Sequence, residues 1–293
     1  MTETKELCLY HNDQDGCCAA AIVRRRFGHD VKLIPIDYGY PLPWEELDAA
    51  ERVYIVDFSL PLEEMLRIQQ HAELIWIDHH KSSLLALESL ETFGLRAMDR
   101  AGCVLTWQTF YPEIPIPRPV MYIGERDIWS FQHEDTKPFC EGVYQQDPDP
   151  INDALWVPLL DDDEMLVAQY VEEGRLLLKA RLREIQRKID NYGFEVVFEG
   201  YRTLAINARG TGEIGEYVRS LGYEICYAFY QTRRDGELIT GVTLYSDQVD
   251  VSRVAERFGG GGHEGASGFL FVNKENPFPP DSAVALVQPD QEG

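Results

Sequence analysis

The sequence predicts an α/β protein of two lobes, in which an N-terminal parallel-sheet domain is joined by a helical connector to a smaller C-terminal α/β domain. Over the first 80 residues, short apolar segments alternate with helix-like segments, which is typical of βαβ units. From residue 194 onward the pattern changes to closely spaced strands. A chain of 293 residues is also longer than one hydrophobic core usually organises.

The first lobe begins with four expected strands, at 6–10, 31–36, 52–56 and 73–77. Helix-like stretches separate the first two and the last two. In the stretch before the fourth strand, Pro61 suits a first helical turn and Ser59 can cap it. Because helices connect these strands, they are expected to pair in parallel.

Further along, residues 100–111 predict another helix, and residues 120–131 carry an apolar segment up to Asp127. Residues 136–162 have the composition of a loop. Helical spacing returns over 163–192, and residues 233–237 (RRDGE) form a hairpin turn between two of the later strands. The predicted organisation is an N-terminal domain over 1–135, a linker and connector helix over 136–193, a C-terminal domain over 194–275 and a flexible tail over 276–293.

Composition narrows the range of functions. The net charge of −23 disfavours long nucleic acids as ligands, because such a surface repels polyanions. No apolar run approaches the roughly 20 residues needed to span a bilayer, so no membrane partner is expected. Six cysteines without a CxxC pair predict reduced, buried thiols in a cytoplasmic protein. The oligomeric state stays open, with a dimer among the alternatives.

Acidic and imidazole side chains follow the predicted strands at their carboxyl ends, where open α/β sheets bind ligands. They are His11, Asp13, Asp15, Asp37, Asp57, Asp78, His79 and His80, and Asp127 follows a later apolar segment. Asp37 fits a turn residue better than a ligand. The other carboxylates would repel one another in a single cleft unless cations were bound.

Two divalent ions are expected, because there are more ligands than one ion needs. Carboxylate and imidazole ligands suit Mn²⁺, Mg²⁺, Fe²⁺, Co²⁺ or Zn²⁺. Asp57, alone after a central strand, is the expected bridge; Asp15 and Asp127 would complete one ion, and His11 with Asp13 the other. An ion pair of this kind activates a water for displacement at phosphorus.

The motifs HNDQDG (11–16), VDFS (56–59), DHHKS (78–82) and RDIW (126–129) resemble the four ordered motifs of the DHH phosphoesterases, in the superfamily of nanoRNases and RecJ-like exonucleases. The stretch GGGGHEGASGF (259–269) resembles the glycine-rich motif of the C-terminal domain that accompanies many of them. The resemblance spans about residues 6–272. His11 lies two residues before Asp13, whereas several branches of the family place this histidine four residues before.

The resemblance implies a metal-dependent phosphoesterase site between two lobes, holding two ions, with Mn²⁺ first and Mg²⁺ or Co²⁺ as alternatives. The implied metal ligands are His11, Asp13, Asp15, Asp57, His79 and Asp127. Asp57, Asp78, His79 and His80 are the expected catalytic group, in which Asp78 and His80 flank the ions or contact phosphate. The implied substrate contacts are His80, Gly260, Gly261, Gly262 and His263.

Two further residues are read from the sequence directly. Arg209 could meet a substrate phosphate, although an exposed, solvated position suits it somewhat better. Trp129 could stack a base or pack under its loop.

The expected function is hydrolysis of phosphodiester bonds in short oligoribonucleotides or linear dinucleotides through a water activated by two metal ions. The acidic surface favours short substrates over long ones. The alternative enzyme is a phosphatase or pyrophosphatase acting on nucleotide bisphosphates or polyphosphate. The alternative from another class is a catalytically inactive nucleotide sensor, which is disfavoured because no motif aspartate is missing.

Overall fold

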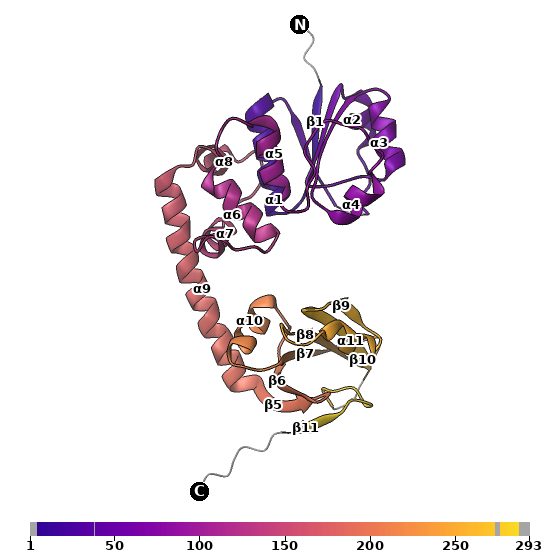
Figure 1. The fold of residues 1–293 in the computed structure, drawn as a ribbon, viewed down its shortest axis with the longest axis vertical. Coiled ribbons are helices and arrows are strands. Elements are labelled where there is room, and N and C mark those ends of the chain that lie inside the picture. The colour runs from indigo at the N-terminus through magenta and orange to yellow at the C-terminus, as the bar shows by residue number, and fades with distance from the viewer. Residues whose placement is uncertain (1–4, 38, 273–275, 287–293) are drawn as a thin grey trace. The chain divides into compact units, whose positions relative to one another are not determined.

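The computed structural model describes residues 5–37, 39–272 and 276–286. They fall into two compact units, Met1–Lys179 and Ala180–Gly293, and the division lies within the long helix α9 (Glu164–Tyr192). The first unit is drawn in indigo to pink in Figure 1 and the second in orange to yellow. No helix among the described residues is both long enough and apolar enough to span a membrane.

The first unit is built on a four-stranded parallel sheet, as the sequence predicts. Its strands are β1 (Glu6–His11), β2 (Lys32–Ile36), β3 (Arg52–Val56) and β4 (Glu73–Ile77), in the spatial order β2-β1-β3-β4. The connections are α1 (Gln14–Phe27), α2 (Trp44–Ala49) and α3 (Leu62–Gln69). The helix α3 has no side-chain cap, and the Ser59 hydroxyl instead donates to Ser83 Oγ at 2.6 Å.

Helices cover both faces of this sheet (Figure 1). Alternate strand residues point to opposite faces, so Leu9 and Ile55 pack in one apolar cluster, while Cys8 and Tyr54 pack in the other. The remaining helices of the unit are α4 (Lys81–Ala86), α5 (Gly102–Phe110), α6 (Arg118–Asp127), α7 (Thr136–Val143) and α8 (Asp153–Leu160).

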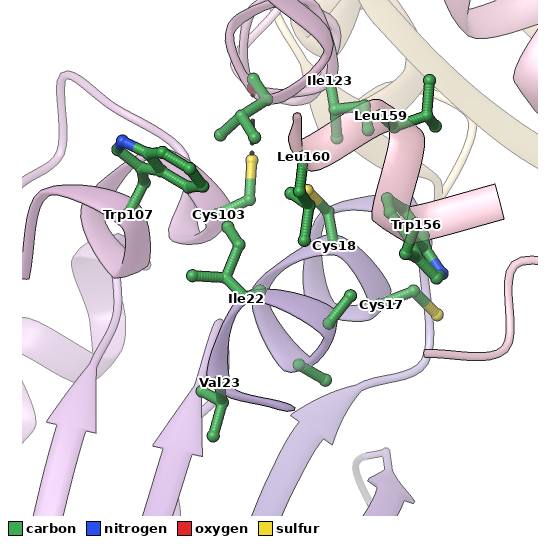
Figure 2. Close-up of a cluster of buried hydrophobic side chains, with 14 of the residues drawn as sticks. Cys17, Cys18, Ile22, Val23, Cys103, Trp107, Ile123, Trp156, Leu159 and Leu160 are labelled. Atoms are coloured by element: carbon green, nitrogen blue, oxygen red, sulfur yellow. Dashed lines mark hydrogen bonds between the residues drawn. The ribbon is translucent and has the colours of Figure 1, made fainter. Parts of the chain in front are cut away.

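The helix α1 forms the centre of the larger cluster (Figure 2). Its small side chains, including Cys17 and Cys18, let α5, α6 and α8 approach closely. All six cysteines of the chain are buried and free, in agreement with the prediction.

The structure corrects the prediction of a loop over 136–162, because α7 and α8 lie there and pack into the same cluster. The sequence of α8, DALWVPLL, is apolar almost throughout and contains Pro158, so it has no amphipathic period. The helix α7 contains Pro138 and Gly142, which usually indicate turns. Gly142 is required by packing instead: a Cβ there would lie 2.2 Å from the carbonyl oxygen of Tyr170 in α9.

The second unit is a seven-stranded mixed sheet, in the order β11-β5-β6-β7-β8-β10-β9, and thus an α/β domain as predicted. Its strands are β5 (Gly193–Phe198), β6 (Tyr201–Asn207), β7 (Ile225–Arg234), β8 (Glu237–Tyr245), β9 (Gly261–His263), β10 (Ala266–Val272) and β11 (Val284–Leu286). Its helices beyond α9 are α10 (Gly212–Ser220) and α11 (Val251–Glu256). The turn between β7 and β8 is the predicted hairpin.

The C-terminal segment differs from the predicted flexible tail over 276–293. Phe278 is buried in the core of the second unit, and β11 pairs antiparallel with β5. The segment is short, polar and rich in proline, so its composition indicates neither the buried Phe278 nor the three-residue strand β11. Residues 287–293 lie outside the described residues.

Candidate metal centre

The side chains predicted to bind metal converge in the first unit. His11 ends β1, Asp13 and Asp15 begin α1, and Asp57 and Asp78 follow β3 and β4 directly. Parallel strands end at one edge of a sheet, which brings the residues after them together. Asp127, the last residue of α6, completes the set from outside the sheet.

Asp57 occupies the middle of this arrangement. It is buried, and its backbone has a φ of 54°, a left-handed conformation that few residues other than glycine adopt. Its backbone N–H donates to the carbonyl of Ile77 at 2.9 Å. Its two carboxylate oxygens face opposite sides: Oδ1 lies 3.1 Å from His79 Nε2, and Oδ2 lies 3.7 Å from His11 Nδ1.

Three groups of potential ligands therefore overlap, each with its ligand atoms within 4.8 Å of one another. They are His11 with Asp13 and Asp57, Asp15 with His79 and Asp127, and Asp57 with His79 and His80. His79 Nε2 lies 3.3 Å from Asp127 Oδ2 and 4.0 Å from Asp15 Oδ2. The structure brings together every residue that the sequence proposes as a metal ligand.

Backbone amides hold two of the carboxylates in place. Asp15 is buried and accepts from the N–H groups of Gly102 at 2.6 Å and Cys103 at 2.9 Å, at the start of α5. Asp13 caps α1 by accepting from Gly16 N–H at 2.9 Å. Both contacts orient the carboxylates without help from an ion, so the site is largely preformed.

Asp78 positions His80. It is fully buried, and its Oδ1 accepts from the backbone N–H groups of His79 and His80 at 2.7 and 3.2 Å. The same oxygen lies 2.7 Å from His80 Nδ1. This contact raises the pKa of His80. Asp78 thus orients an imidazole and is not itself a member of the three ligand groups.

The carboxylates of this cluster repel one another, and the repulsion shifts their pKa values. Burial, joined by the charges of Asp13 and Asp127, raises the pKa of Asp57 to about 7. Burial and the neighbouring carboxylates also raise the pKa of Asp15 well above its usual value, and burial raises that of Asp127. The carboxylates of Asp13 and Asp57 raise the pKa of His11 to about 10.

The residues present fit divalent metal ions. Both carboxylate oxygens of Asp57, Nε2 of His79 and Nδ1 of His11 are buried and have no hydrogen-bond partner among the described residues. Buried polar atoms are rarely left so. A pair of cations between these groups would satisfy the atoms and remove the repulsion that raises the pKa values. The mixed oxygen and nitrogen donors suit Mn²⁺, Mg²⁺, Co²⁺ and similar ions.

The predicted substrate contacts of the glycine-rich stretch lie in the second unit. His263 is exposed in β9, an edge strand of its sheet. The amide of Gly260 donates to the carbonyl of Ala255 at 2.9 Å, so it is already used within the unit. Gly262 has a φ of 145°, and Gly261 pairs with Gly268. These glycines thus shape a tight β-hairpin.

Arg209 also lies in the second unit, in the loop after β6. Its guanidinium carbon lies 4.7 Å from the centroid of the Tyr230 ring.

The sequence did not single out a pocket that adjoins the centre, with a volume of about 370 Å³. Asp13, Asp15 and Asp127 line one part of it, and Arg126, Trp129 and Tyr144 line another. The sequence indicates Trp129, which lies two residues after Asp127, but not Tyr144, because the proline and glycine of the preceding helix α7 resemble loop residues. Asp37 is expected to be a turn residue, and its Oδ1 lies 4.0 Å from Nε2 of His11.

Comparison with known proteins agrees with this architecture. No family model matches the chain. It is 29% identical over 291 residues to the uncharacterized protein R106 of Acanthamoeba polyphaga mimivirus, covering 91% of this chain and 67% of that protein.

Among solved structures, the DHH domain of a member of a ribosomal protein family superposes with a TM-score of 0.56 at 14% identity, over 92% of this chain and 83% of that one. The pGpG-specific phosphodiesterase PggH of Vibrio cholerae superposes with a TM-score of 0.51 at 13% identity, over 92% and 94% of the two chains.

Proposed function

We propose that the chain, which has the fold of the DHH phosphoesterases over 92% of its length, is a metal-dependent phosphoesterase that hydrolyses short oligoribonucleotides or linear dinucleotides. The observation that carries the proposal is the set of ligand groups that meet at Asp57 with buried, unsatisfied donor atoms. Two ions bound there would supply a nucleophilic water and a charge clamp on the phosphoryl group.

The residues of the centre have distinct proposed roles. Asp57 is shared by two of the ligand groups and would contact both ions. His11 and Asp13 would hold one ion, and Asp15, His79 and Asp127 the other. His80, oriented by Asp78, would donate a proton or a hydrogen bond to a phosphate oxygen, because its raised pKa favours the imidazolium form.

The choice of substrate has two supports. The net charge of −23 disfavours binding to long polyanions, while a short substrate needs only the local charge of the ions. PggH, whose fold the chain shares, is a pGpG-specific phosphodiesterase, and pGpG is a linear dinucleotide. We extend that substrate class to this chain as a proposal.

The test is hydrolysis in Mn²⁺ by the wild type and by Asp57→Asn. Asparagine is preferred to alanine because it tolerates the left-handed backbone of residue 57. The panel contains linear dinucleotides, a 5-mer RNA, a cyclic dinucleotide, adenosine 3′,5′-bisphosphate and pyrophosphate. Cleavage of the dinucleotides or the 5-mer is expected, and the variant should lose more than the roughly 10- to 100-fold typical of partners of metal ligands.

The matched control is Asp99→Asn, which removes an exposed carboxylate of the first unit and should leave the rate unchanged. Turnover of only the bisphosphate or pyrophosphate would replace the proposed substrate with the alternative one. Tight dinucleotide binding in saturating Mn²⁺ without turnover of any compound would indicate a sensor and end the proposal of catalysis.

A further inference from the structure

We infer that the pocket beside Asp127 receives a nucleobase of the substrate, and that Trp129 is the surface on which this base stacks. The inference rests on the proposed function, since it concerns the nucleotide whose phosphate lies at the metal centre. It adds a specificity-determining site that belongs entirely to the first unit.

The pocket is continuous with the metal centre. Three of the proposed ligands, Asp13, Asp15 and Asp127, form part of its lining, and Trp129 and Tyr144 form another part. Its volume of about 370 Å³ is near the lower end of the roughly 300–1,000 Å³ of small-molecule sites. The pocket is therefore large enough for a nucleoside attached to a phosphate at the ions.

Large aromatic side chains are exposed in this pocket. Trp129 is 60% exposed and Tyr144 is 74% exposed, although both are among the bulkiest side chains available for burial. The structure therefore disfavours the packing of Trp129 under its loop. The guanidinium carbon of Arg126 lies 4.7 Å from the centroid of the Trp129 ring. The ring of Phe131 lies in a T-shaped contact with the same indole, with the ring centroids 4.8 Å apart, and a base would stack on the part of the indole that stays exposed.

The loop that carries Trp129 is held firmly. Trp129 and Phe131 have φ values of 58° and 44°, and such strained backbones persist only where the surroundings enforce them. One residue that holds the loop is Glu125, which is buried. Its carbonyl accepts from Ser130 N–H at 2.9 Å, and its carboxylate accepts from His133 N–H at 3.1 Å and from the Thr136 hydroxyl.

The charges of the pocket favour a neutral base over a second phosphate. Asp13, Asp15 and Asp127 would be neutralised by the ions, but Glu141 also lines the pocket. Arg126 is the one basic residue among the described residues of the lining. A phosphate placed beyond the ions would meet the charge of Glu141, whereas an uncharged aromatic ring would not.

The experiment combines a substitution of Trp129 with the removal of one base from the substrate. Steady-state kinetics are measured in Mn²⁺ on a linear dinucleotide and on its two abasic analogues, each lacking one base. Trp129→Ala should raise KM for the complete dinucleotide by about 10- to 100-fold, the range expected from base–aromatic stacking, with little change in kcat. The analogue that lacks the stacked base should show no such response, and Trp129→Phe should retain most of the wild-type KM.

The matched control is Trp44→Ala, which removes another arginine–tryptophan pair of the first unit, with Arg67, outside the pocket. It should leave KM unchanged. An equal effect of Trp129→Ala on complete and abasic substrates would overturn the inference, because the side chain would then be structural.

Binding separates this inference from the proposed function. Adenosine 5′-monophosphate is titrated calorimetrically into the wild type and Trp129→Ala in the presence of Mn²⁺. If no phosphodiester is turned over, the proposed function fails, yet weaker binding by Trp129→Ala alone would still support the base site. Equal binding by the two proteins would overturn the base site whatever the turnover.

Discussion

A β-carbon at position 102 would lie only 2.5 Å from Cβ of Asp57, so the first residue of α5 can approach the centre of the metal cluster only as glycine. The same β-carbon would lie 2.9 Å from Oδ2 of Asp15, which accepts from the Gly102 N–H. The start of α5 therefore sets the separation of two proposed ligands.

Substitution of Gly102 should damage the centre through sterics alone. Gly102→Ala must displace either Asp57 or Asp15, and overpacking of this kind costs about 1–3 kcal/mol. We expect Mn²⁺ affinity, measured by calorimetry, to fall by at least about tenfold, since ligand geometry governs binding. Gly212→Ala is the control, because a Cβ there has no atom within 4 Å. Unchanged affinity in Gly102→Ala would contradict the close packing.

Asp78→Asn should lower the pKa of His80. The carboxylate of Asp78 contacts Nδ1 and raises the pKa of the imidazole, so its neutral isostere should reverse that direction. NMR titration of the metal-free protein measures the change, and activity should fall roughly 10- to 100-fold. Asp99→Asn should leave the titration of His80 as it is. A His80 titration that is insensitive to Asp78→Asn would argue against the orienting contact.

Mn²⁺ should stabilise the protein more at high pH than at low pH. The pKa of Asp57 rises from 3.8 unfolded to about 7 folded, so the metal-free fold loses stability as the pH rises through that range. The pKa of His11 rises from 6.5 to about 10, which has the same sign over a higher range. Thermal unfolding should show a larger Mn²⁺-induced rise in Tm at about pH 8 than at about pH 5.5. Asp57→Asn should reduce the difference, and an equal rise at both pH values would refute this account.

Glu125→Gln should loosen the loop that carries Trp129. The carboxylate accepts hydrogen bonds from His133 N–H and the Thr136 hydroxyl in a buried setting, and the loss of such a partner costs about 1–3 kcal/mol. Chemical denaturation measures the cost. Glu172→Gln removes an exposed carboxylate of the same unit and should change stability by less than about 0.5 kcal/mol. If Glu125→Gln and Glu172→Gln lost the same free energy of unfolding, Glu125 would not be the residue that holds the loop.

Phe278→Ala should destabilise the second unit. The side chain is buried among the aromatic residues of that core, and removal of a buried phenylalanine costs about 3–5 kcal/mol. Leu286→Ala, at an exposed position of β11, should cost little and serves as the control within the same segment. Denaturant unfolding of both variants compares them. A small loss in Phe278→Ala would restore the flexible tail that the composition suggests.

The parallel sheet and the gathering of acidic and imidazole residues at its edge were predictable because each rests on a local pattern. The four strands are short apolar runs, and the residue that follows a strand must lie at the sheet edge. Asp57 could thus be placed next to His79 from the order of elements alone. The hydrogen bonds from the start of α5 to Asp15 could not, because they join residues 87 and 88 positions apart in the chain.

The structural features that the sequence does not indicate share a physical cause. The helix α8 is apolar even where it is exposed, as at Val157, so its sequence lacks the alternation that indicates a helix. Tyr144 follows α7, whose proline and glycine resemble loop residues, so the pocket around Trp129 could not be assembled from the sequence. Phe278 shows the same effect, because a single anchoring side chain leaves no periodic pattern.

The left-handed backbone of Asp57 also shapes how this protein can evolve. Asparagine and glycine adopt that conformation at low cost, whereas most other residues would strain the turn after β3. A codon for aspartate becomes one for asparagine by a single nucleotide change. Under the proposed function, this one change would remove a metal ligand while leaving the backbone of residue 57 unstrained, so a variant that keeps the fold without the proposed hydrolysis lies one step from this sequence.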